Sequence, residues 1–137
     1  GIHTLLNVFR AFPRHFSNFV FVSVGVVDSG AFKGASELEG LERRTAAELE
    51  RYVELAQRLG HAATARMRLG TDAVAEVEAL CVELAREFSH AVFFAGKVIF
   101  QKDHWWDPLL HNQTAFAVQK RLQWQGIPMV IMPVRVR

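Results

Sequence analysis

Six residues in short polar turns are the candidates for binding a ligand. They are glycines, an aspartate, a threonine, a histidine and an asparagine, each next to an expected strand or helix. Backbone N–H groups at glycines and at helix starts, together with small polar side chains, can hold a nucleotide or an inorganic anion. The same residue types also dominate ordinary turns and helix caps, so both interpretations stay open at this point. The candidate nucleotide- or anion-binding residues are Asp28, Gly70, Thr71, Gly96, His111 and Asn112.

No catalytic or metal-binding motif accompanies these residues. The sequence has no glycine-rich phosphate loop, and Gly96-Lys97 alone does not make one. It has no Gly-x-Ser-x-Gly elbow, and Cys81 falls on the apolar side of an expected helix, where cysteine acts as a small apolar residue. The six histidines show no metal-ligand spacing. We therefore predict that the chain is not an enzyme and binds no metal, and that a nucleotide is the one cofactor left open.

Composition indicates one folded domain that spans residues 1–137. Half of the residues are apolar and 22% are charged, as in globular proteins. The formal net charge is only +2, which predicts no nucleic-acid partner because phosphate binding needs a concentrated basic face. The single cysteine fits a reducing compartment. No apolar run is long enough to cross a membrane, so the domain itself is expected to be soluble.

Hydrophobic periodicity predicts a chain that alternates strands with helices. A short helix comes first, and every later strand except the last is followed by a helix. Ser36 and Glu39 fit a capping box, Thr71 a helix cap, and Gly60 and Gly126 left-handed helix stops. The expected strands are 19–27, 61–69, 91–95 with an extension to 100, and 129–136, and the expected later helices are 36–59, 72–88 and 109–125.

This order predicts an open, mostly parallel, doubly wound α/β sheet. The strands 19–27 and 91–95 are apolar on both faces, as in parallel strands covered by helices on both sides, whereas 61–69 alternates and is expected nearer a sheet edge. A fold of this class usually begins with a strand, so its first strand is expected to be missing here. The start at Gly1-Ile2-His3 rather than Met adds to the expectation that the chain is a piece of a longer protein.

Several separate segments carry a family resemblance. They are Phe21-Val-Ser-Val-Gly-Val-Val-Asp-Ser29, Gly70-Thr71-Asp72, Ala91-Val-Phe-Phe-Ala-Gly-Lys97, Leu109-Leu-His-Asn-Gln-Thr-Ala-Phe116 and Gln123-Trp-Gln-Gly-Ile-Pro-Met129. Together they resemble the cytoplasmic C-terminal domain of bacterial amino-acid/polyamine/cation (APC) superfamily permeases, over essentially the whole chain. In that family the domain follows the membrane helices, and a further strand and a glycine-rich turn precede the matching start. The resemblance therefore implies a domain attached to a transporter of amino acids or cations.

The same resemblance implies an architecture of universal-stress-protein-like type, a nucleotide-binding α/β fold. Members that bind ATP carry Gly-x-x-Gly, nine residues and then Gly followed by Ser or Thr. Gly96 matches the first glycine, but Ile99 stands at the second, and His111-Asn112 replaces the final Gly-Ser pair. These departures argue against ATP binding in the usual manner. Related stress proteins dimerise through the last strand, so the resemblance also implies a homodimer through 128–137.

The leading hypothesis is a non-catalytic regulatory or oligomerisation domain of an APC-superfamily amino-acid or cation permease. Such a domain would lie on the cytoplasmic side of the cell membrane, with the membrane-embedded part of the same transporter as its partner. The alternative is a free-standing universal-stress-type protein that holds a nucleotide among the six candidate residues. A nucleotidyl transferase that uses Thr71 and Asp72 has only the support of fold-level analogy.

Overall fold

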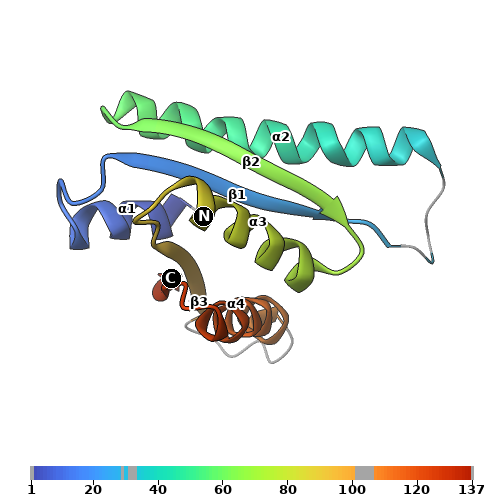
Figure 1. Ribbon diagram of the computed structural model, residues 1–137. Coiled ribbons are helices and arrows are strands. Elements are labelled where there is room, and N and C mark those ends of the chain that lie inside the picture. Colours follow the sequence, from blue (N-terminus) through green and yellow to red (C-terminus); the bar gives the residue numbers. More distant parts are fainter. Residues whose placement is uncertain (1, 29, 31–33, 101–106, 137) are drawn as a thin grey trace. The chain divides into compact units, whose positions relative to one another are not determined.

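The computed structural model describes residues 2–28, 30, 34–100 and 107–136, with side chains outside 97–100, 107–113 and 133–136. Helices and strands alternate along these residues in the predicted order (Figure 1). The elements are α1 (Ile2–Ala11), β1 (Asn18–Val26), α2 (Ala35–Arg58), β2 (Ala62–Gly70), α3 (Ala73–Glu87), β3 (Phe93–Phe100), α4 (Asp107–Trp124) and β4 (Met129–Val136).

The prediction of an α/β chain with parallel strands is confirmed. In the described part of the chain the strands form two parallel pairs, β1–β2 and β3–β4, where one open sheet was expected. The chain accordingly divides into two compact units, one formed by 14–80 and the other by 1–13 with 81–137. Each pair joins strands that are neighbours in the sequence, since a helix crossover returns the chain parallel to the strand it left.

The unit 14–80 is built on the β1–β2 pair. The two strands run in continuous register from Asn18 opposite Ala62 to Val26 opposite Gly70. Helix α2 packs against both strands. Its buried residues Val53 and Ala56 form a core with Ala63, and three partly buried residues pack on that core: Phe19, Phe21 and Ala65. This unit therefore has its apolar centre between α2 and one face of the strand pair.

Close approach of α2 to β1 depends on Gly25. A Cβ atom built at this residue would lie 2.5 Å from Leu69 Cδ2, 3.1 Å from Leu41 Cγ and 3.2 Å from Thr45 Oγ1. Leu41 and Thr45 belong to α2, so the helix lies directly over the glycine. The Thr45 hydroxyl is itself buried there and donates to the Leu41 carbonyl oxygen at 2.9 Å. A glycine in this strand thus serves packing rather than a turn.

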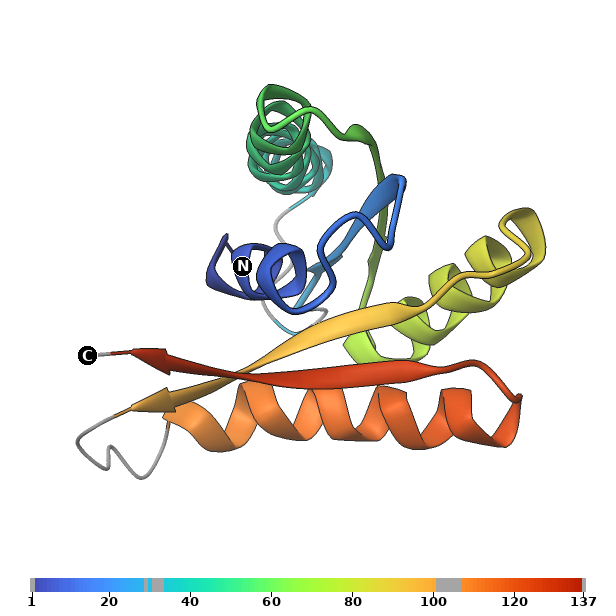
Figure 2. The same cartoon turned by 90° about the vertical axis from the view of Figure 1, so that its left-hand side faces the viewer.

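The other unit is built on the β3–β4 pair, with a helix on each face. Its register runs from Phe93 opposite Met129 to Phe100 opposite Val136. Helices α1 and α4 both contact the two strands and lie on opposite faces of the pair (Figure 2). The apolar residues that α1 and α4 bury are Leu5, Val8, Val118 and Leu122. This unit has the layered arrangement that the apolar composition of β3 predicts.

Two glycines end helices as predicted. Gly60 follows α2 with a φ of 90° and donates to the Gln57 carbonyl oxygen at 3.0 Å, while His61 N–H donates to Ala56 O at 2.9 Å. Gly126 follows α4 with a φ of 71°, and the bonds there have the same spacing. Both are Schellman motifs, in which a left-handed residue lets two orphan carbonyls be satisfied.

The predicted helix starts were wrong by one or two residues. Helix α2 begins at Ala35 with Gly34 as its N-cap, and no side chain caps it, so Ser36 and Glu39 do not form a capping box. Ser36 lies inside the first turn of α2, so its hydroxyl is not at the N-cap, the position from which a side chain reaches the free N–H groups. At α3 the cap is Asp72 rather than Thr71.

Candidate functional site

The carboxyl ends of β1 and β2 bring three of the six candidate residues to one edge. Val26 lies opposite Gly70, and Val27 N–H donates to the Gly70 carbonyl oxygen at 2.8 Å. Because the strands are parallel and in register, Asp28 and Thr71 both leave the sheet at this edge, next to Gly70. The structure therefore assembles Asp28, Gly70 and Thr71 as expected for the ligand-binding end of a parallel sheet.

Asp28 already has a local role in its loop. Its Oδ1 atom accepts a hydrogen bond from Gly30 N–H at 3.0 Å, two residues on. This bond is the Asx turn that Asp commonly forms where a chain leaves a strand. Asp28 is exposed, so its other oxygen can face solvent. The geometry gives this carboxylate a turn-forming function and leaves an acceptor, rather than a donor, for a ligand.

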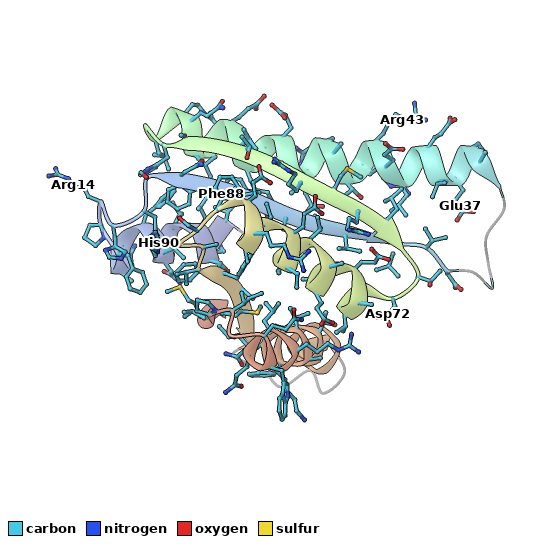
Figure 3. All side chains as sticks on the ribbon, in the orientation of Figure 1. Arg14, Glu37, Arg43, Asp72, Phe88 and His90 are labelled. Atoms are coloured by element: carbon cyan, nitrogen blue, oxygen red, sulfur yellow. The ribbon has the colours of Figure 1, made fainter. Side chains whose placement is uncertain are left out.

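The start of α3 is already occupied by the chain's own carboxylate. Asp72 Oδ1 accepts from Ala75 N–H at 3.1 Å, and Asp72 O accepts from Glu76 N–H at 3.1 Å. Asp72 stands where β2 gives way to α3 (Figure 3). A free helix start attracts anions, but a carboxylate cap satisfies one N–H group and adds negative charge there. The Gly70–Asp72 turn is thus a poor phosphate site, and Thr71 is exposed beside it.

Two residues that the sequence analysis did not single out complete this end of the sheet. Arg68 Nε lies 2.8 Å from Glu76 Oε2 in a hydrogen-bonded ion pair that joins β2 to the first turn of α3. Glu76 also covers Gly70: a Cβ atom at Gly70 would lie 2.6 Å from Glu76 Cγ. The absence of a side chain at Gly70 therefore makes room for Glu76. The signal available in the sequence was an arginine near the end of a strand and a glutamate in the next helix turn.

Gly96 lies within β3 and packs against a helix. It is paired with Met132 in the middle of the ladder, with β3 continuing to Phe100. A Cβ atom at Gly96 would collide with the Thr4 hydroxyl oxygen of α1. Thr4 is buried, and its hydroxyl has no hydrogen-bond partner among the described residues. The glycine thus permits α1 to approach β3, which is a sufficient reason for its residue type.

His111 and Asn112 do not stand at a helix start, as had been expected. Helix α4 begins at Asp107 rather than near Leu109, so both residues lie in its second turn. The free N–H groups of a helix belong to its first turn, here 107–110, in which Pro108 has no N–H, and the N–H groups of His111 and Asn112 lie beyond that turn, where they bond within the helix. Their side chains lie outside the described part of the structure. The backbone therefore gives these two residues no anion-binding role.

The one cysteine is buried in α3. Cys81 is 3% exposed, and burial raises the pKa of its thiol to about 11 from an ordinary value of 9.0. At neutral pH the sulfur is therefore the weakly nucleophilic thiol.

Within the described residues no three His, Cys, Asp or Glu side chains gather closely enough to hold a metal ion. None of the described helices is both long and apolar enough to span a bilayer.

The six candidate residues are divided between the two compact units. Asp28, Gly70 and Thr71 share one sheet end in the unit 14–80, while Gly96, His111 and Asn112 belong to the other unit. In the first unit Asp28 and the turn before α3 are engaged in local hydrogen bonds, and in the second Gly96 is a packing residue. Comparison with known protein families, with curated proteins and with solved structures found no match to this chain.

Proposed function

We propose that the chain is a regulatory or oligomerisation domain of an APC-superfamily amino-acid or cation permease. It acts by binding rather than by catalysis, and it works on the cytoplasmic side of the membrane against the membrane-embedded part of the same transporter. The resemblance of the segments around Phe21–Ser29, Ala91–Lys97 and Gln123–Met129 to that domain supports the proposal. The transported solute binds elsewhere in the transporter.

One observation carries the proposed universal-stress-protein-like architecture. The parallel pairs join β1 to β2 and β3 to β4, and a helix precedes β1. In a doubly wound sheet of order 3-2-1-4-5, the strands on either side of the first strand form two such pairs of sequence neighbours. A chain that contributes every strand of this sheet except the first has the order of elements and the pairing seen here.

Regulation by such a domain requires a difference in affinity. A transporter alternates between conformations, and a bound domain shifts their populations only by the difference in its binding free energy to each. A preference of about 1.4 kcal/mol changes the ratio of the two conformations tenfold. This effect needs no chemical reaction at the domain. It is therefore compatible with a domain whose candidate polar residues form turns and helix caps.

The geometry counts against the nucleotide-binding alternative. A nucleotide phosphate needs free N–H groups, whereas the Asp72 carboxylate occupies one at the start of α3. Thr4 fills the space beside Gly96 where a phosphate would approach the backbone. Thermal unfolding with ATP and AMP tests the alternative directly, because a ligand of the native state must raise the melting temperature. We expect no rise at millimolar nucleotide.

The deciding experiment is an immunoblot of membrane and soluble fractions from the source cells, with an antibody raised against this chain. The proposal predicts a band much larger than 15.5 kDa that is confined to membranes. An extraction of the same membranes with carbonate separates an integral protein, which stays, from a peripheral one, which leaves. A soluble band near 15.5 kDa would overturn the proposal.

A further inference from the structure

The C-terminal part of the chain has an unusual charge distribution. From Pro108 to Arg137 there is no aspartate or glutamate, although this stretch contains Lys120, Arg121 and two further arginines. All 14 acidic residues of the protein therefore lie in the first 107 positions. A strong asymmetry of charge between parts of a chain indicates contact with a polyanionic surface. The small net charge of the whole chain conceals this local excess.

Helix α4 is apolar on two opposite sides. One side is buried by β3 and β4, and it carries Val118 at 1% exposure and Leu122 at 0%. The opposite side carries Phe116, Lys120 and Trp124, which are four residues apart and therefore lie in one row along the helix. Phe116 is 45% exposed and Trp124 is 84% exposed. Lys120 is exposed as well, and so is Arg121, which lies about 100° farther round the helix, on the flank of this row.

This combination differs from an ordinary solvated helix surface. Helix α2 also has exposed arginines, among them Arg43 and Arg44, but glutamates such as Glu42 and Glu48 are exposed on the same helix. Arg43 points away from the strands that α2 covers (Figure 3). The six glutamates and four arginines of α2 give it a net charge of −2, and such a mixed surface is well hydrated. The outer row of α4 lies in a stretch without acidic residues, and it exposes two large aromatic rings, which is costly in water.

We propose that Phe116, Lys120 and Trp124, together with Arg121 on the flank of this row, form a surface, the α4 outer surface, that rests on an anionic lipid bilayer. Trp favours the level of the lipid headgroups, because its apolar ring can lie against the lipid there while its N–H stays hydrated. Each basic residue near an anionic bilayer contributes an attraction to the headgroups, and long basic side chains keep their charge in water while their stems lie on apolar groups. Two cations are too few for a nucleic-acid backbone, which requires a longer basic track. The inference stands whether or not the chain belongs to a transporter.

The test is co-sedimentation of the purified chain with phosphatidylcholine vesicles, with and without phosphatidylglycerol. We expect binding only to the vesicles with phosphatidylglycerol, and weaker binding as salt is raised. Replacing Lys120→Gln and Arg121→Gln together removes two contributions of about fivefold each, so the partition coefficient falls roughly 25-fold. The matched control is Arg43→Gln with Arg44→Gln, which removes the same charge from α2 and leaves binding unchanged. Trp124→Ser, at a side chain too exposed to affect folding, also weakens binding.

Each remaining outcome overturns the inference. Equal sedimentation with neutral and anionic vesicles would show that the cations contribute nothing. An equal loss in the α2 control would show attraction by net charge rather than by the α4 outer surface. Displacement from anionic vesicles by a single-stranded oligonucleotide, at matched phosphate concentration, would assign the surface to nucleic acid instead. Because this measurement uses the isolated chain, its result is independent of the fractionation experiment above.

Discussion

Replacing Gly96 by alanine tests how α1 is held on the β3–β4 pair. The new methyl group would overlap the Thr4 hydroxyl oxygen, with Thr4 Cβ at 3.4 Å and Cγ2 at 3.7 Å. Thr4 is branched at Cβ and is therefore stiff about χ1, so α1 must move away from β3. Overpacking of this kind costs about 1–3 kcal/mol. Removing a glycine from a strand returns about 0.5–1 kcal/mol, so we expect a net loss of roughly 1–2 kcal/mol.

The second half of this prediction is rescue by a change at Thr4. Thr4→Ala removes Oγ1 and Cγ2 and leaves only the Cβ atom at 3.4 Å, which is an ordinary contact. In that background Gly96→Ala should be neutral or slightly stabilising, which gives a coupling free energy of about 2 kcal/mol. Thr4→Val is the control, because it keeps both branches in place and should not rescue. It also removes a buried hydroxyl without a partner among the described residues, so by itself it should cost nothing or stabilise.

The assay is urea unfolding followed by circular dichroism, with the free energy of unfolding extrapolated to water for each variant. The reasoning would be refuted by additivity, that is, by an equal effect of Gly96→Ala in the unsubstituted chain and in the Thr4→Ala and Thr4→Val backgrounds. Additive effects within about 0.5 kcal/mol would mean that the glycine does not contact α1 in the way described. Gly96 would then be a candidate ligand-binding residue again.

Other contacts give three more predictions. Asp72→Ala should lower the free energy of unfolding by about 1 kcal/mol, because it removes the cap of α3, whereas Thr71→Ala, one residue away, should have little effect in the same urea titration. Burial raises the pKa of Cys81 from 9.0 to about 11, so the native state keeps the thiol proton to a higher pH than the unfolded state does. The free energy of unfolding should therefore be constant below pH 9 and fall by about 2–3 kcal/mol as the pH rises to 11. The Cys81→Ala variant should lack this fall. Val27 N–H bonds to β2, so by alternation the amides of Phe21 and Ser23 point to β2 and should exchange slowly with deuterium, while those of Val20 and Val22 on the other edge of the isolated chain exchange fast. Fast exchange at Phe21 and Ser23 would contradict the pairing.

Much of the fold was predictable because local signals agreed with one another. The apolar residues of β1 and β3 and the periodicity of α2 left little choice of element type. Gly60 and Gly126 marked helix ends correctly because a left-handed C′ residue is strongly biased to glycine. Helix starts were less certain, since Thr71 and Asp72 both have capping side chains and only the exact end of β2 decides which of them reaches Ala75.

The candidate site shows where sequence reasoning reaches its limit. A glycine that admits a phosphate and a glycine that admits a helix look the same in a sequence, and Gly96 could be assigned to packing only after α1 was seen on β3. The sequence also did not predict the ion pair of Arg68 and Glu76, because the two residues lie in different elements, eight positions apart. The sequence named Asp28 and Thr71 as candidates, but only the pairing of β1 with β2 shows that both lie at one sheet end, where the observed contacts form a turn and a helix cap.

The two strands of the β1–β2 pair differ in a way that bears on the proposed fold. Among the described residues each pairs with only the other, so each has one free edge. β2 has the character of an edge strand, with Arg66 and Arg68 on one face, and charged residues there discourage further pairing. β1 has no charged residue between Phe19 and Val27, and its free edge offers the N–H and C=O groups of Val20 and Val22. A strand with this composition is typical of the interior of a parallel sheet. The asymmetry supports a sheet that continues beyond β1 rather than beyond β2, which is the side on which the proposed architecture places its first strand.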